Sequence, residues 1–216
     1  MKRFQSNNTD TQMGISIFDT RDVGLLPPQA IISTHSFATS RTPAIPKYMD
    51  KGFLFGKTQF IRPKDMPQSL EDLLNRNRNL VLVGHGFGSD LQVLRHLGLD
   101  LKASFVGMFD TADINNEVSD LPSTSNPVQL RQILERLGWS LARLHIAGND
   151  TNFTLRALLL LAVDSYCGQE ELLDNVAHDR QEILGAIGHA PLPAPTANPI
   201  TKAKKLRQKL IRSLEE

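Results

Sequence analysis

The run Leu80-Val81-Leu82-Val83-Gly84-His85-Gly86-Phe87-Gly88-Ser89-Asp90 carries the strongest signal for the fold of this chain. Its first four residues are uninterrupted apolar residues, which is typical of a short strand buried on both faces. The three glycines that follow predict a turn. From Asp90 onward, leucines recur at helical spacing up to Leu97, and Gly98 ends the predicted helix. A strand, a turn and a helix in this order indicate an α/β domain.

The segments on either side extend this pattern. We predict strands at 14–18, 30–37, 53–61, 80–83 and 103–109. We predict helices at 69–79, 90–97, 127–137, from Asn149 or Asp150 to 166, and at 169–187. Residues 111–126 lack periodicity and are expected to be a polar loop. The order of these elements predicts a mixed five-stranded sheet flanked by helices.

The 216 residues divide into one domain and two tails. Residues 1–12 are polar and aperiodic, and we expect them to be disordered. The domain is expected at 13–189, and a proline-rich linker with a basic amphipathic helix at 190–216. The helix includes Lys204, Lys205 and Arg207. It is either a solvated terminal helix or an arm that binds nucleic acid.

The composition limits the class of protein. A net charge of +1 means that any affinity for nucleic acid must come from local patches. Cys167 is the only cysteine, which excludes an internal disulfide and a multi-cysteine zinc site. The N-terminus lacks the apolar core of a signal peptide, and the apolar run 155–163 is too short to cross a membrane. We therefore expect an intracellular protein of the cytoplasm or nucleus, without a membrane partner.

Three segments place ionisable side chains where elements begin or end. Asp19 ends the first predicted strand, Asp90 lies on the helix after the fourth, and His145 precedes Asp150 by five positions. Each residue has an ordinary interpretation on its own. Asp19 could be a turn residue, and Asp90 a first-turn acid favoured by the helix dipole. His145 could be a loop histidine and Asp150 an N-cap. Their occurrence together and in this order is what indicates one site.

With these motifs the chain resembles the DEDDh 3′–5′ exonucleases of the RNase H-like superfamily, and most closely a fungal exonuclease-like branch. His85 with Asp90 and His145 with Asp150 match two His-x4-Asp motifs of that family, and Asp110-Thr111 matches its strand-end Asp-Thr. The similarity extends over residues 14–188. It implies an RNase H-like mixed five-stranded sheet.

The resemblance also implies a two-metal site for phosphodiester hydrolysis, holding Mg²⁺ or Mn²⁺. In it Asp19, Asp90 and Asp150 would bind the metals and His145 would be the general base. The four side chains are then expected to converge in one cleft. His85 and Phe87 would contact the nucleic acid, Phe87 by stacking on a base.

Residue 21 departs from the family pattern, which has a glutamate two positions after the first acid. Arg21 occupies this position, and its permanent charge would repel a metal ion. It is expected to pair with one of the acids or to bind a phosphate. Asp22 points to the opposite face unless a bulge turns it inward.

Two functions remain open. The first is a pseudonuclease that binds RNA, single-stranded DNA or a protein partner without cutting and needs no cofactor. The alternative is an active metal-dependent 3′–5′ exonuclease. Two other motifs are set aside. The residue at the nucleophile position of a Gly-x-Ser-x-Gly elbow is Gly86, and the full Gly-x-Gly-x-x-Gly dinucleotide signature is missing.

Overall fold

The computed structural model describes residues 12–39, 52–74, 78–98, 105–119, 128–140, 143–166 and 175–193. Within these ranges the chain forms mixed helices and strands, which confirms the expected α/β class. None of the described helices combines the length and the apolar character needed to cross a membrane. Of the tail expected to be disordered at 1–12, residues 1–11 lie outside the described residues, and Gln12 is the first residue of a strand. The expected basic helix with Lys204, Lys205 and Arg207 also lies outside them.

In the described part of the chain, five strands form two separate sheets. In the first, β1 (Gln12–Phe18) pairs antiparallel with β2 (Ile32–Ala38), and β2 pairs parallel with β3 (Gln59–Phe60). In the second, β4 (Val81–Gly84) pairs parallel with β5 (Gly107–Asp110). The expected five strands are present among the described residues, but β1 and β4 are not joined in one sheet. Periodicity indicates which residues of a strand are buried, but it does not indicate which strand lies next to it. The pairing of these strands therefore could not be predicted from the sequence pattern.

The helices correct several expected boundaries. They are η1 (Thr20–Asp22), α1 (Pro28–Ile31), η2 (Pro63–Asp65), α3 (Met66–Leu73), α4 (Gly88–His96), α6 (Thr111–Val118), α7 (Leu130–Arg136), α8 (Ala147–Asp164) and α9 (Asn175–Gly188). The prediction of a polar loop at 111–126 is wrong for its first half. There the Asp110 carboxylate accepts the backbone N–H of Ala112 and caps α6, a local signal that periodicity does not report.

Two other boundaries differ for identifiable reasons. The expected strand at 53–61 is reduced to its last residues, because the chain bends at 54–56, where Gly56 has a φ of 152°. The long helix α8 begins after Ile146, so neither Asn149 nor Asp150 is its N-cap. Asn149 is fully buried instead. Its side chain bonds the backbone of Leu54, Gly52 and Arg143 at 2.8–2.9 Å and holds these loops against the helix.

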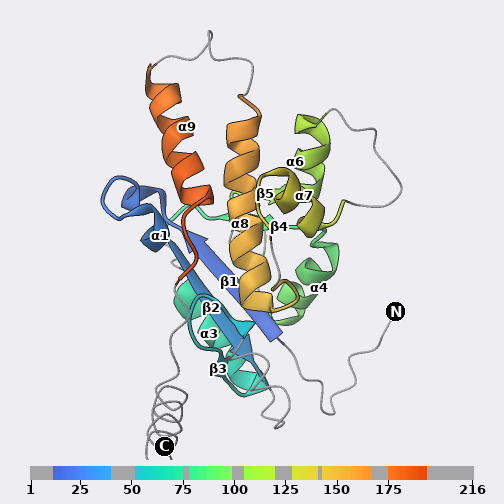
Figure 1. The fold of residues 1–216 in the computed structure, drawn as a ribbon. Helices are drawn as coiled ribbons and strands as arrows, with labels where there is room; N and C mark the ends of the chain where they lie inside the picture. The colour runs from blue at the N-terminus through green and yellow to red at the C-terminus, as the bar shows by residue number, and fades with distance from the viewer. Residues whose placement is uncertain are drawn as a thin grey trace, which may run out of the picture.

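The two faces of β1 are covered by different helices. Ser16 hydrogen-bonds Thr151 of α8 at 3.2 Å, and Phe18 packs against Leu159 of α8 and Ile187 of α9. The alternate residues, including Met13 and Ile15, pack against α3 and α4 through a cluster centred on Leu70. Figure 1 shows α8 lying along β1, with α9 on one side of it and α6 and α7 on the other. The strand therefore lies between two layers of helix, as the alternation of its side chains requires.

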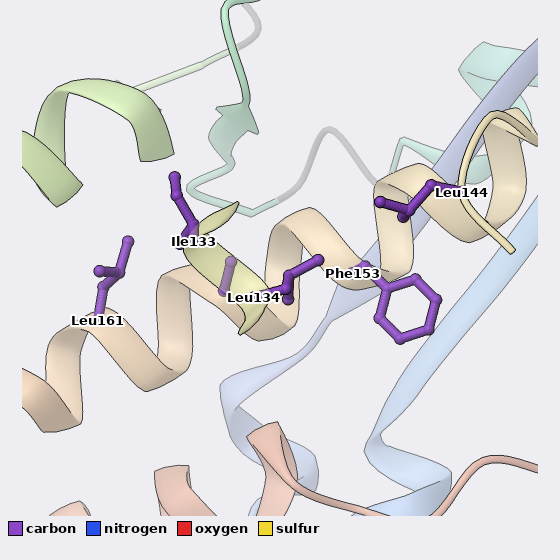
Figure 2. Packing of buried hydrophobic residues seen from close by; sticks show 6 residues of the cluster. Ile133, Leu134, Leu144, Phe153 and Leu161 are labelled. Carbon is purple, nitrogen blue, oxygen red and sulfur yellow. The ribbon is translucent and has the colours of Figure 1, made fainter. Parts of the chain in front are cut away.

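The main core lies where α7 crosses α8. Figure 2 shows Ile133 and Leu134 of α7 beside Phe153 and Leu161 of α8, with Leu144 near the start of that helix. Leu134, Phe153 and Leu161 are each fully buried. Trp139 packs edge-on to Phe153 with ring centroids 5.7 Å apart, as expected for a core residue.

A buried arginine crosses this core. Arg156 of α8 is 3% exposed, and burial lowers its pKa to about 10. Its guanidinium donates to Asn152 at 2.7 Å and to the carbonyls of Gly188 and Ala190, at the end of α9. It also lies 5.1 Å from the centre of the Trp139 ring. The charge is thus compensated by the negative end of a helix and an aromatic face rather than by a carboxylate.

The backbones of β1 and α8 approach each other closely at Gly14. A Cβ atom there would lie 2.0 Å from the carbonyl oxygen of Ala147, in the first turn of α8. We expect Gly14→Ala to push α8 away from β1 and to cost about 1–3 kcal/mol or more in the free energy of unfolding. Gly107→Ala is the matched control, because its Cβ would meet no atom within 4 Å. In urea denaturation, Gly107→Ala should leave the free energy of unfolding unchanged or raise it slightly. An equal loss of this free energy in both variants would contradict the close contact at Gly14.

Candidate functional site

The carboxyl ends of β4 and β5 lie side by side, as parallel pairing of Gly84 with Asp110 requires. The Asp110 carboxylate accepts the backbone N–H groups of Gly86 and Ala112, both at 2.9 Å. Thr111, fully buried, donates from its hydroxyl to the Gly84 carbonyl and lies 3.0 Å from Nδ1 of His85. The Asp-Thr pair therefore holds the loop that leads into α4.

His85 and Phe87 both already make contacts within this loop. Burial lowers the pKa of His85, while the charge of Asp110 raises it to a smaller extent. The ring of Phe87 covers the backbone of Gly84 so closely that a Cβ there would lie 2.3 Å from it. His85 is therefore a hydrogen-bonded imidazole whose burial disfavours its charged form, and one face of Phe87 is already covered.

Asp19 lies between two arginines. Arg21 donates to it from Nε at 3.0 Å and from Nη2 at 2.7 Å, and the backbone N–H of Arg21 also bonds to it. Arg78, just before β4, forms a second ion pair with the same carboxylate. The hydrogen bonds from Arg21 hold the pKa of Asp19 well below its usual range, with a smaller contribution from Arg78. Of the pairings expected for Arg21, the structure contains the one with Asp19.

Asp150 and His145 form a separate local unit. Asp150 lies in the first turn of α8 and accepts the backbone N–H of His145 at 2.9 Å. Burial raises the pKa of Asp150, and its contacts with His145 partly oppose this rise. His145 is exposed and has a φ of 73°, an uncommon conformation outside glycine. The carboxylate thus fixes a strained residue directly before the helix.

Asp90 lies in the first turn of α4 and is exposed, although partial burial raises its pKa. Its neighbour Leu91 packs into the cluster that covers the Met13 and Ile15 face of β1. Asp19 belongs to the same alternate set of residues, and its backbone is still extended. Asp90 and Asp19 are therefore on one side of β1.

Asp150 belongs to the helix on the opposite face. The first turn of α8 contacts Gly14 and Ser16, whereas Phe18, next to Asp19, packs with Leu159. Leu159 lies roughly 12 Å further along the helix than Thr151, at 1.5 Å per residue. The four side chains expected in one cleft therefore occupy three environments. The described residues contain no group of three or more His, Cys, Asp or Glu side chains arranged to hold a metal ion.

Two functional contacts were missed in the sequence. Arg78 falls near the end of the helix predicted at 69–79, and only the tertiary structure brings it to Asp19. The capping role of Asp110 had a usable signal, because an acid between a strand and a helix is a favoured N-cap. The assigned roles of Asp19, Asp90, Asp150 and His145 in metal binding and proton transfer remain predictions.

The strand-end acid, the His-x4-Asp segments and the α/β architecture define a DEDDh exonuclease-like domain. The chain belongs to the DEDDh_C family, described as DNA polymerase III subunit epsilon-like, C-terminal domain, whose model matches residues 4–161. This match covers more than half of the chain and includes all three motif segments. No curated protein matches the chain.

The raised pKa of Asp150 gives a prediction with a definite sign. Burial disfavours its charged form, so this group costs stability above its unfolded pKa of about 4, and the cost disappears as the pH falls and it becomes protonated. Asp150→Asn removes the charge and keeps an acceptor for the His145 N–H. It should stabilise the fold at pH 7 by a few tenths of a kcal/mol, since the carboxyl is partly exposed.

The gain from Asp150→Asn should shrink toward pH 3. Asp150→Ala is the control: it loses the acceptor as well and should cost about 1 kcal/mol at both pH values. Thermal denaturation across this pH range measures both differences. A loss with Asp150→Asn at pH 7 would mean that the carboxylate charge itself stabilises the native state.

Proposed function

We propose that this chain is a nucleic-acid-binding domain of exonuclease-like architecture whose metal-dependent hydrolysis is impaired. Its ligand would be RNA or single-stranded DNA. One observation carries the proposal: the carboxylate of Asp19, expected to bind metal ions, is engaged by the guanidinium groups of Arg21 and Arg78. These groups stay charged at every physiological pH.

A metal ion does not fit this arrangement. To bind Asp19 it would have to displace two ion pairs and remain close to two positive charges. Asp150, which would complete the ligand set, lies on the helix that covers the other face of β1. We therefore assign no step of hydrolysis to Mg²⁺ or Mn²⁺ in this chain.

The same arginines favour contact with phosphate. The side chain of Arg21 is 63% exposed, and its hydrogen bonds to Asp19 use only two of the five N–H donors of a guanidinium. A guanidinium held rigid by a carboxylate has lost its freedom before the ligand arrives, which lowers the entropic cost of binding. The hydrogen bond with Asp19 raises the pKa of Arg21 most, and the nearby charge of Asp22 adds a smaller rise. The local positive charge is therefore modest, and we expect weak, salt-sensitive binding.

Restoring an acid tests the impairment. Arg21→Glu combined with Arg78→Ala frees Asp19 and places a second carboxylate beside it. We expect the double variant to bind Mn²⁺ on the order of tenfold more tightly than wild type, or better, since two nearby positive charges are removed. Isothermal titration and the Mn²⁺-dependent shift in melting temperature measure this gain. A 3′-labelled single-stranded substrate reports any cleavage.

Arg62→Glu is the matched control, because Arg62 is an exposed arginine that pairs with one aspartate, Asp65, elsewhere on the surface. It changes the net charge as Arg21→Glu does and should leave Mn²⁺ binding unchanged. Mn²⁺ binding and cleavage by wild type, abolished by Asp19→Ala, would establish the alternative of an active 3′–5′ exonuclease. Failure of wild type to bind any single-stranded oligonucleotide would contradict the proposal itself.

The basic tail is the second expected source of affinity. Lys204, Lys205 and Arg207 belong to a segment of six basic residues whose contacts with phosphate would release counterions. Packing of the domain continues through Ala190, whose carbonyl binds Arg156, to Leu192. Truncation should therefore begin at residue 194.

Removing residues 194–216 should lower oligonucleotide affinity and flatten its salt dependence. The log–log slope should change by about 0.7 for each phosphate that the tail neutralises on a single strand. Fluorescence anisotropy at several salt concentrations measures the slope. A melting temperature equal to that of the full chain would show that the domain is intact. An unchanged slope would identify the tail as a solvated segment without a role in binding.

A further inference from the structure

An apolar hollow lies between the end of β1 and helix α9. It is lined by Phe18, Thr20, Val23, Arg180, Ile183 and Leu184. Ile183 is 39% exposed, although its neighbour Leu184 packs into the cluster beneath. The hollow is thus an opening in the surface above a well-packed cluster.

Beside the hollow, a leucine projects into solvent from an ordered turn. Leu25 is 79% exposed, the highest value among the exposed large apolar side chains of the described residues. Its backbone is not loose: the N–H groups of Leu25 and Leu26 both bond to the carbonyl of Asp22 at 3.0 Å. Gly24, with a φ of 81°, supplies the left-handed conformation that the turn needs. A rigid turn that presents leucine to water is a preorganised apolar anchor.

This turn and α9 lie next to each other. Val23, which precedes the turn, packs in the same cluster as Leu184 and Ile187 of α9. Figure 1 shows the loop between β1 and α1 beside the end of α9 where the helix meets the sheet. One surface therefore carries both a protruding apolar side chain and an apolar hollow.

We propose that this surface, formed by the hollow, the turn at Leu25 and α9, is the contact between two copies of this chain related by a two-fold axis. A two-fold axis brings the same surface of both copies together. The protruding leucine of each copy can therefore face the hollow of the other. Leu25 of each copy would enter the hollow of its partner and cover Ile183.

The charges on α9 favour the same partner. Asp179 and Arg180 are adjacent and exposed, and neither forms an ion pair within the described part of the chain. In a two-fold arrangement of α9 against its copy, Arg180 of one copy faces Asp179 of the other, and the reciprocal pair forms as well. The chain's own basic tail would place lysines against Arg180 and is the poorer occupant.

The experiment is sedimentation velocity on the full chain between roughly 1 and 100 µM, the range of weak specific dimers. We expect a reversible monomer–dimer equilibrium. Leu25→Asp and Ile183→Asp should each raise its dissociation constant about tenfold or more, because both place a carboxylate in the apolar contact. Met108→Asp is the control, since Met108 is 53% exposed on β5. It should leave the equilibrium unchanged.

A charge exchange identifies the orientation. Arg180→Asp should weaken the dimer by placing like charges opposite each other, and Asp179→Arg with Arg180→Asp should restore most of the association. An unchanged melting temperature would confirm that each variant is folded. The proposal would be overturned if the wild type were monomeric at every concentration. It would also be overturned if the dimer withstood Leu25→Asp and Ile183→Asp, or if Met108→Asp disrupted it equally. Oligonucleotide binding is measured separately, so either proposal can fail alone.

Discussion

The close contact of α8 with β1 is the constraint on which the rest of this structure depends. The carbonyl of Ala147 lies where a Cβ of residue 14 would be, so only glycine lets the helix start against the strand. From this point α8 follows β1, and its other sides support α6, α7, α9 and strand β4 of the second sheet. A helix held this firmly at one end provides a surface against which several elements of the domain pack.

Polar groups inside the domain determine how the layers are aligned. Ser16, Thr34, Asn152 and Arg156 form a continuous chain of hydrogen bonds from β1 and β2 through α8. Arg156 ends the chain at the carbonyls of Gly188 and Ala190. Apolar packing alone tolerates small shifts, whereas a buried donor without its acceptor costs about 1–3 kcal/mol. The network therefore specifies where α9 ends relative to α8.

The candidate site could be predicted from the sequence in part. Asp19 at a strand end, Asp90 in the first turn of a helix, and His145 close to Asp150 were all located correctly on their elements. Their mutual arrangement was not predictable, because it depends on which face of β1 each helix covers. Arg78 gave no signal at all, since an ion pair across 59 positions leaves no periodicity in the chain.

The sequence by itself determined the α/β class, five strands in approximately the right places, the family motifs and the presence of an arginine two positions after the strand-end acid. These features are local: they follow from side-chain alternation, glycine turns and residue identity. Only the tertiary structure decided that the strands form two sheets, that Arg21 and Arg78 share Asp19, and that Asp150 lies on the other face. These outcomes are contacts between distant segments, and the free energy that selects them comes from packing and ion pairing that no single segment contains.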